Sequence, residues 1–545
     1  MAATAVVGAL IAVGSTTTAT AAPTDASEAL GRFLQGQAAG INLDSVAAVQ
    51  GALAQNPSGV HPTAQDPLSA SVLNAISINL GDSLQLFGPN GVINLGAVAQ
   101  YASAQDNGDA LAASGAVNDQ GAISVGGSPT APANANINLT NLLTRVGVPT
   151  AGILDTASVE LGALSGQVSQ TGGATPVTDY QIAGATLKLQ SPLVKNVYTQ
   201  LQGSVNSVQT VLNGLQATLN TALNLPALNL GVVSAAPTVN VTVPNLSLLL
   251  PTGAVGSGTG VTVDLTTGAV TVDLALLLAS DPTLPDLNDL GPNTSLLSGP
   301  IGAAIAAGIT AAITAQLTSV VSNVQAAVQA TQVKAVVQVK VLGANAVTLT
   351  LDAPLSAIQD GSATFVATGA VANLLNTVLS VLGLSLNQIT TLLLNAVLQT
   401  VGGVFTALTT LNTTVTNITT GLAVNVVGPV LNIVRLAVDL TANAQPAVGD
   451  LGAGSTTVRA VQVSLVPALS LASIGLGSAT VRGTLVIDYE TAITATPGTV
   501  NPGGTTTITG TGFAPNEAVT ISAPGVTSVT TQSSATGTIS APISI

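Results

Sequence analysis

Cysteine and tryptophan are absent from this 545-residue sequence, and histidine and methionine each occur once. Disulfides are therefore excluded, and so is a zinc site, which takes several Cys or His ligands. Charged residues make up only 6% of the chain and aromatic residues 2%. General bases are mostly His, Asp, Glu or Lys, and nucleophilic thiols come from Cys. Because these residue types are scarce or absent here, the composition argues against an enzyme.

Clustered positive charge is absent as well. The nine Lys and Arg residues are scattered among 23 Asp and Glu, which gives a net charge of −14 and a pI near 4.1. Nucleic acid and anionic lipid are held by clusters of Lys and Arg. The sequence therefore predicts no nucleic-acid partner.

What the chain does contain is apolar residues. They make up 47% of the sequence, and the mean hydropathy is +0.60. Disordered chains are poor in apolar residues and rich in charge, so this chain is expected to fold. Its length suits roughly two to four domains with a substantial buried core. With so few charges, its solubility must rest on Thr, Ser, Asn and Gln.

Residues 1–21 are typical of a signal peptide. An apolar run over residues 6–13 is followed by small residues ending in Ala19-Thr20-Ala21, an A-x-A cleavage site. No Lys or Arg precedes Arg32, although a signal peptide has a basic start. We therefore expect either that the true start codon lies further upstream or that the sequence is a truncated fragment. The alternative interpretation is an Ala/Thr-rich tail.

The pattern of apolar residues changes after the first segments of the mature chain. Residues 26–36 (ASEALGRFLQG) and 43–59 (LDSVAAVQGALAQNPSG) have helical spacing, with Asp44 near the start of the second helix. From Ile76 onward, apolar and polar residues alternate, and short strands with Gly, Asn and Asp turns continue to residue 190.

Three later segments carry the apolar stripe of a long amphipathic helix, over residues 201–223, 301–328 and 404–418. Ser385 and Gln388 form a capping box before the third. Between these helices the sequence predicts two hairpins, at residues 261–274 and 334–352. The predicted fold class is α+β, with antiparallel sheets and several long uncharged amphipathic helices.

The helices are long enough to cross a membrane, because residues 291–332 and 361–434 contain no charge. Thr, Asn, Gln and Ser nevertheless occupy the face opposite each apolar stripe. This arrangement favours helices that are buried on one side in a water-soluble fold, and a membrane span or pore is the alternative.

One short motif suggests a serine esterase. Ser83 lies in SINLGDSLQLFG, which resembles the nucleophile motif of the Gly-Asp-Ser-Leu hydrolases. That family uses a downstream Asp-x-x-His and a Gly-x-Asn-Asp block, whereas the single histidine here is His61, upstream, and PDLNDLG has Asp286 in place of the Gly. Without an imidazole base the hydroxyl is not activated, so Ser83 is interpreted as a turn residue and no catalytic residue is predicted.

Metal sites have weak candidates only. Asp106 and Asp109 in AQDNGDAL could offer oxygens to calcium, and so could Asp281, Asp286 and Asp289, but neither group has the spacing of a calcium loop. We interpret both as turns with solvated carboxylates and predict no cofactor, with calcium as the alternative. Carboxylate pairs for glycoside hydrolysis stay open, because such pairs meet only in the fold.

The C-terminal residues 493–522 (ITATPGTVNPGGTTTITGTGFAPNEAVTIS) resemble the start of Ig-like, IPT/TIG-type repeats, through the Gly-x-Gly-Phe-x-Pro corner. The last residues supply too few strands to close such a sandwich, so an incomplete all-β Ig-like domain is expected. The motif implies an architecture and is silent about a ligand.

The main body also resembles a known family. The segments LGRFLQG, LDSVAAVQGALAQNPSG, VLNAISINLGDSLQL and LVIDYE, in that order, are similar to the choice-of-anchor G family of exported actinobacterial proteins. The resemblance implies export and attachment to the cell envelope, and it brings no catalytic residues, substrate or cofactor. No Leu-Pro-x-Thr-Gly motif or hydrophobic tail is present to act as the anchor.

Together these observations predict a signal peptide (1–21), an α+β body (22–490, with a possible subdivision near residue 190) and a partial Ig-like domain (491–545). The predicted function is that of a non-enzymatic, secreted or cell-surface structural or adhesive protein. Its expected partners are neutral glycans, cell-wall polymer or neighbouring copies, with membrane contact only through a missing anchor. The alternatives are a hydrolase acting on envelope polymers and a membrane-active protein.

Overall fold

The structure is a computed structural model of the whole chain. It describes residues 13–14, 27–46, 49–56, 63–68, 76, 78–80, 84–88, 91–105, 108–116, 135–145, 147–172, 174–226, 233–341, 343–369, 380–381, 385–483, 491–501, 503–513, 516 and 518–545.

A seven-stranded antiparallel sheet forms the centre of the body. In spatial order its strands are β17 (Thr294–Ser295), β21 (Val438–Ala444), β22 (Thr456–Leu465), β23 (Ala472–Gly483), β2 (Ser27–Ala38) and β3 (Ile41–Asn42), with β4 (Ala52–Asn56) also paired to β2. The longest pairing joins β2 to β23, from Ser27 opposite Gly483 to Ala38 opposite Ala472. The two ends of the body sequence are therefore hydrogen-bonded to each other in the middle of the sheet.

The prediction of helices over residues 26–36 and 43–59 is wrong. The first segment is β2, and the second contains a 3-10 turn, η1 (Leu43–Ser45), followed by β4. Most of β2 is buried, and consecutive residues, which point to opposite faces, are buried alike over Ser27–Gly31 and Phe33–Gln35. A strand buried on both faces loses its period-two alternation, so apolar spacing does not distinguish it from a helix.

A five-stranded sheet packs face to face on the first sheet. Its strands are β12 (Val177–Ile182), β11 (Leu164–Gln170), β8 (Ala110–Gly115), β7 (Ala99–Ala104) and β5 (Thr63–Gln65). The two backbones approach closely: a Cβ placed on Gly166 would lie 2.2 Å from the Gly477 carbonyl oxygen, and one on Gly31 would lie 2.3 Å from that of Tyr101. Small residues at this interface are therefore a steric requirement.

A six-stranded sheet completes the body beside the base of the helices. Its strands are β15 (Val261–Asp264), β16 (Ala269–Asp273), β13 (Ala185–Gln190), β10 (Thr156–Leu161), β9 (Ala135–Asn138) and β6 (Ile93–Asn94), and the short helices α2 (Thr140–Arg145) and α4 (Leu274–Ser280) flank it. The hairpin predicted over residues 261–274 is confirmed as β15 and β16.

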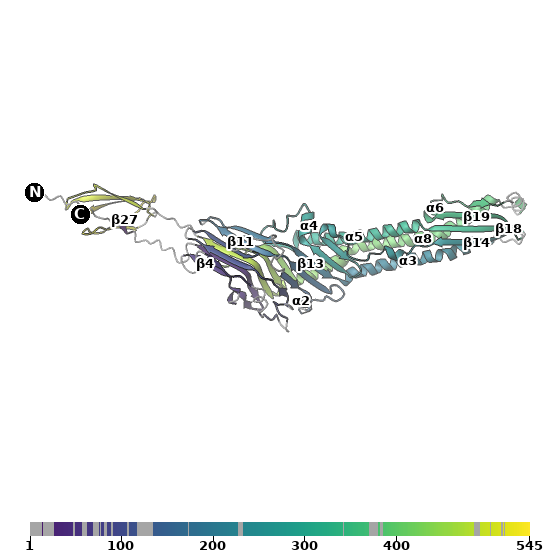
Figure 1. Ribbon diagram of the computed structural model, residues 1–545, viewed down its shortest axis with the longest axis horizontal. Coiled ribbons are helices and arrows are strands. Elements are labelled where there is room, and N and C mark those ends of the chain that lie inside the picture. Colours follow the sequence, from purple (N-terminus) through teal and green to yellow (C-terminus); the bar gives the residue numbers. More distant parts are fainter. Residues whose placement is uncertain are drawn as a thin grey trace.

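Three long helices form an arm that leaves the body (Figure 1). They are α3 (Pro192–Leu223), α5 (Gly299–Gln329) and α8 (Leu386–Leu422), and both α3 and α5 pack against α8. Their buried residues follow the predicted apolar stripes, and Ser385 and Gln388 form the predicted capping box. A π-helical turn, η6 (Ala423–Val427), joins α8 to α9 (Gly428–Ala437), where Pro429 has no N–H for a regular helical bond.

A four-stranded antiparallel sheet covers the far end of the arm (Figure 1). Its strands are β14 (Val233–Thr242), β18 (Gln332–Val341), β19 (Ala344–Pro354) and β20 (Val366–Thr368). The short helix α6 (Leu355–Gln359) directly follows β19 in the chain and packs against α8. The hairpin predicted over residues 334–352 is confirmed as β18 and β19. Short 3-10 turns, η4 (Leu246–Leu249), η5 (Ser257–Thr259) and η7 (Pro467–Leu469), lie in the connections.

The C-terminal module contains two three-stranded antiparallel sheets. One is β24 (Ala492–Thr496), β25 (Thr505–Thr511) and β28 (Ile539–Ser544), and the other is β1 (Val13–Gly14), β26 (Ala518–Ile521) and β27 (Val529–Gln532). Its small core, which includes Ile508, Phe513 and Ile543, is separate from the large core of body and arm. Long helices and antiparallel sheets together confirm the predicted α+β class.

Candidate binding site on the polar face of the seven-stranded sheet

The seven-stranded sheet has a polar face on the side away from the five-stranded sheet. Gly31 faces the five-stranded sheet, so the neighbouring Arg32 lies on the opposite side of β2. Further along, Gln35 of β2, Gly475 of β23 and Gln462 of β22 are paired in one row across three strands. This row forms the floor of the candidate site.

An irregular row crosses the sheet next to that floor. The pairing of β21, β22, β23 and β2 skips one residue on each strand, namely Asn443, Ala460, Gly477 and Phe33. Asn443 and Gly477 have positive φ angles, of 49° and 66°. Such residues reverse the alternation of side chains locally.

The irregular row brings Arg459 to the polar face. In a regular strand, residues three apart point to opposite faces, yet Arg459 Nη1 donates to Gln462 Oε1 at 3.1 Å. Arg459 also lies directly over Gly475, since a Cβ placed on that glycine would be 2.5 Å from Arg459 Cδ and 2.7 Å from Gln35 Nε2. Because Gly475 has no side chain, the side chains of Arg459 and Gln35 can occupy the space above it.

Asp450 neutralises this arginine. It lies in the connection between β21 and β22, and its Oδ1 is 2.7 Å from Arg459 Nη2. Ser478 Oγ donates to the other carboxylate oxygen at 2.9 Å. The two charged side chains are 9% and 14% exposed for Asp450 and Arg459. A pair so well buried and bonded presents little net charge to a ligand.

An open groove of about 300 Å³ lies over this floor. Its lining residues, which are all polar or glycine, are Gln35, Gly36, Gln37, Asn42, Arg459, Gln462 and Ser473. Gln462 Nε2 donates to Ser473 Oγ at 3.0 Å, which fixes both side chains. The groove therefore offers amide, hydroxyl and guanidinium groups for hydrogen bonds, and no nucleophile paired with a base is among its lining residues.

One buried donor in the site has no acceptor, because Arg459 Nε has no hydrogen-bond partner. The amide of Gln35 lies beside it: Gln35 Nε2 and Arg459 Nε are 2.7 and 3.0 Å from the position that a Cβ on Gly475 would take. Buried polar groups are nearly always paired, so such exceptions need an explanation.

A second polar cluster lies on the same sheet beyond the groove. Glu28 of β2 forms an ion pair with Arg482 of β23 and accepts from Gln55 Nε2 at 2.9 Å. Glu28 is nearly buried, with 5% of its side chain exposed. Because this pair joins the first and last long strands of the body, we assign it to the closure of the sheet.

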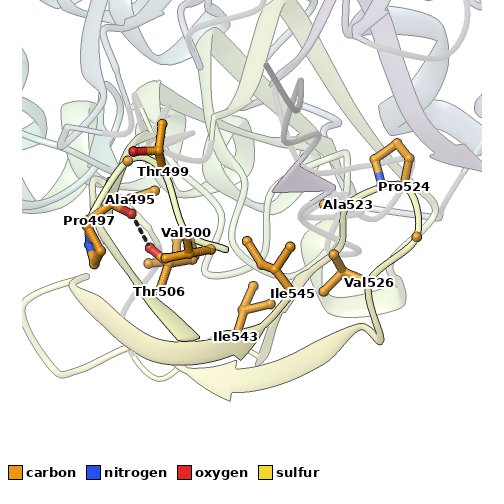
Figure 2. A pocket seen from close by; sticks show the side chains of 13 residues that line it. Ala495, Pro497, Thr499, Val500, Thr506, Ala523, Pro524, Val526, Ile543 and Ile545 are labelled. Atoms are coloured by element: carbon orange, nitrogen blue, oxygen red, sulfur yellow. Dashed lines mark hydrogen bonds between the residues drawn. The ribbon is translucent and has the colours of Figure 1, made fainter. Parts of the chain in front are cut away.

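The C-terminal module contains a different kind of cavity, shown in Figure 2. It has a volume of about 180 Å³ and is mainly apolar, with Val500, Val526, Ile543 and Ile545 among its lining residues. Thr506 Oγ1 donates to the Pro497 carbonyl at 2.7 Å at its edge. No charged residue lines it.

The structure describes only some of the candidate site residues that the sequence suggested. Ser83, His61 and Asp106 lie outside the described residues, so the structure does not place them. Asp109 Oδ1 accepts a hydrogen bond from the Gly172 amide at 2.7 Å, which ties two loops together. Among the residues that the structure does place, no three His, Cys, Asp or Glu side chains gather as metal ligands would.

The groove residues could not be found from the sequence. Gln35 and Gly36 end a segment with helical spacing, and Arg459, Gln462 and Gly475 lie more than 400 residues further along. Only the pairing of β2 with β23 brings them together.

Comparison with known sequences assigns a family. The family described as "Domain of unknown function (DUF8394)" matches residues 29–482, which run from β2 to β23 and so include the body and the arm. No curated protein and no solved structure matches the chain. Because the match covers most of the chain, this protein belongs to the DUF8394 family.

Proposed function

We propose that this chain is an exported, non-catalytic structural or adhesive protein of the bacterial cell surface. The observation that supports the proposal is the arm, whose three long helices carry a small sheet away from the body (Figure 1). An extended shape places the far sheet at a distance from the remainder of the chain. Such a shape suits a protein that bridges or spaces surfaces.

The surface chemistry of the arm supports the same proposal. Residues 196–263, 291–332 and 361–434 contain no charged residue. Along α8, many Thr hydroxyls donate to carbonyls one turn back in the same helix, among them Thr391, Thr406, Thr410, Thr414 and Thr420. The donors of these hydroxyls are thus satisfied within the helix. Contacts of such a surface with neutral polymers or with other copies are expected to depend little on salt.

The proposed location outside the cell rests on the N-terminal sequence and on the choice-of-anchor resemblance. Residues 1–21 have the pattern of a signal peptide, and the resemblance implies attachment to the cell envelope.

Cell fractionation and a pull-down test this function. The purified chain, without residues 1–21, is mixed with cell-wall sacculi at NaCl concentrations from about 0.05 M to about 0.5 M. We expect retention on the sacculi at all salt concentrations, and the native protein in the envelope fraction. Cytoplasmic location, or retention that disappears with salt, would contradict the proposal.

A membrane-active role is the second candidate. Gly299–Gln329 and Leu386–Ala437 are long and apolar enough to cross a membrane, and 33% and 22% of their most apolar windows are buried in the fold. Flotation with neutral lipid vesicles separates the two candidates. The surface role predicts that the chain stays soluble without detergent and remains at the bottom of the gradient, whereas membrane activity predicts that it floats with the vesicles.

A further inference from the structure

We propose that the outer edge of β26 is a strand-acceptor site, and that its occupant is the apolar N-terminal segment of this chain, residues 9–14. The structure describes Val13 and Gly14 of this segment, which form β1. The inference concerns the C-terminal module and does not depend on the proposed surface function. Because residues 1–21 are expected to be removed on export, the site would be filled in the precursor and open in the mature chain.

A strand from the opposite end of the sequence pairs with β26. Val13 lies opposite Ile521 and Gly14 lies opposite Thr520, in an antiparallel register. The other side of β26 is taken by β27. In the part of the chain that the structure describes, β1 is the only strand on the outer side of β26. Without it, the outward N–H and C=O groups of β26 would have no partner in the sheet.

β26 carries none of the features that normally protect an exposed edge. Its residues, Ala518–Ile521, include no charged residue and no proline. Its pairing with β27 runs along the strand without a bulge. Natural sheets block free edges with such features, because an open edge pairs with any available strand. An edge without them is expected to be covered by a strand.

The apolar cavity of Figure 2 lies where an occupant would continue past Ile521. Ile521 is buried in the small core, so the face of β26 that carries it is the core face. On an antiparallel neighbour, the position opposite Ile521 and the position two residues earlier lie on this same face. The earlier position would lie opposite Ala523, which lines the cavity of about 180 Å³ together with Pro524 and Val526. An apolar side chain at that position would fill the cavity.

Residues 9–14 have the pattern that this site requires. With Val13 opposite Ile521, the position two residues earlier is Ile11 in the sequence. The segment reads Ala-Leu-Ile-Ala-Val-Gly and carries no charge, and no charged residue lines the cavity. Leu10 occupies the alternate position, which belongs to the other face of a strand. The site therefore selects for an apolar residue at position 11 and not at position 10.

Peptide titration tests the site. A fluorescent peptide of residues 9–18 (ALIAVGSTTT) is added to the chain that lacks residues 1–21, and binding is followed by anisotropy. We expect saturable binding of one peptide per chain. The peptide with Ile11→Ser should bind at least about tenfold more weakly, because the burial of an apolar side chain is lost. The peptide with Leu10→Ser is the matched control and should bind nearly as well as the parent.

A variant of the chain tests the cavity from the other side. Ala523→Asp places a carboxylate at the cavity rim and should weaken peptide binding by at least about tenfold, because the incoming apolar side chain would desolvate this charge. The control is Ala535→Asp, at an exposed position in the turn after β27, which should bind as the wild type does. Thermal unfolding verifies that both variants fold.

Calorimetry of the full chain gives a second measurement that needs no truncation. Ile11→Ser should lower the temperature of the smaller transition, that of the C-terminal module, whereas Leu10→Ser should leave it unchanged. Absence of peptide binding, or equal effects of the two serine substitutions, would overturn the inference. Dimers of the shortened chain that the peptide does not dissociate would assign the edge to a second copy and overturn it as well. Retention on sacculi is measured without residues 1–21, so the proposed surface function is tested separately.

Discussion

At the scale of single residues, Tyr180 shows how one hydroxyl ties the body to a loop. Its hydroxyl donates to the Leu287 carbonyl at 3.0 Å, or to that of Leu290 at 3.3 Å, and accepts from the Leu290 amide at 2.9 Å. Burial raises the pKa of Tyr180 to about 12, with a smaller contribution from the nearby carboxylates Asp289 and Asp179. The loop is thus held by the neutral form of the phenol.

Tyr180→Phe should lower the free energy of unfolding by about 1–3 kcal/mol, because it leaves buried backbone groups without a partner. In the folded chain the phenol pKa is about 12, above its ordinary value of 10.0. The stabilisation is therefore complete below pH 10 and is lost as the pH rises towards 12. Urea unfolding at several pH values measures it. The difference between wild type and variant should shrink above pH 10, and a constant difference would contradict this assignment.

Three aspartates at turns have lowered pKa values, because nearby Thr and Ser residues donate hydrogen bonds to their carboxylates. Burial alone would raise the pKa of Asp264, but hydrogen bonds from Thr266 and Thr267 outweigh it and lower the pKa. Hydrogen bonds from Thr283 and Ser362 lower the pKa values of Asp281 and Asp360. Asp281 is thus explained as a turn residue, in agreement with its interpretation from the sequence.

At the scale of elements, the contact between the two large sheets depends on glycine. β11 packs on β23 so closely that Gly166 and Gly477 bring their backbones together. Gly166→Ala would place a methyl group 2.2 Å from a backbone oxygen, which cannot move without moving the sheet. Overpacking of this kind costs roughly 1–3 kcal/mol or more.

Chemical denaturation of Gly166→Ala beside Gly184→Ala tests this packing. Gly184 lies in the connection between β12 and β13, and nothing lies within 4 Å of a carbon added there. We expect a clear loss of stability for the first variant and little change for the second. Equal midpoints would show that the sheets can separate without cost.

The elements also differ in how well their sequences predict them. The three arm helices have a polar and an apolar face, so their 3.6-residue period is visible in the sequence. The hairpins of β15–β16 and β18–β19 alternate visibly for the same reason. β2 does not, because consecutive residues along most of the strand are buried on both of its faces.

At the scale of the whole molecule, the separate cores predict separate unfolding. The core of body and arm and the small core of the C-terminal module share no residue. We expect residues 27–483 to fold alone and to keep the main calorimetric transition of the full chain, with one smaller transition missing. A large drop in the main transition on removal of the module would contradict this independence.

The groove is likewise a property of the whole molecule. Gln35 comes from the start of the body, whereas Arg459, Gln462 and Gly475 come from its end. Moreover, the irregular row through Asn443 and Gly477 is what turns Arg459 towards Gln462. A one-residue change in this pairing would send the arginine to the other face.

The sequence by itself determined the class of this protein: a folded, acidic α+β chain with few charged residues, long amphipathic helices and no cysteine. These properties follow from composition and short-range periodicity, which act over one or two turns or strands. Only the tertiary structure decided that residues 27–38 form a central strand, that the helices build an arm, and that a polar groove exists over Gly475. Each of these depends on contacts between residues hundreds of positions apart, and local patterns carry no information about such contacts.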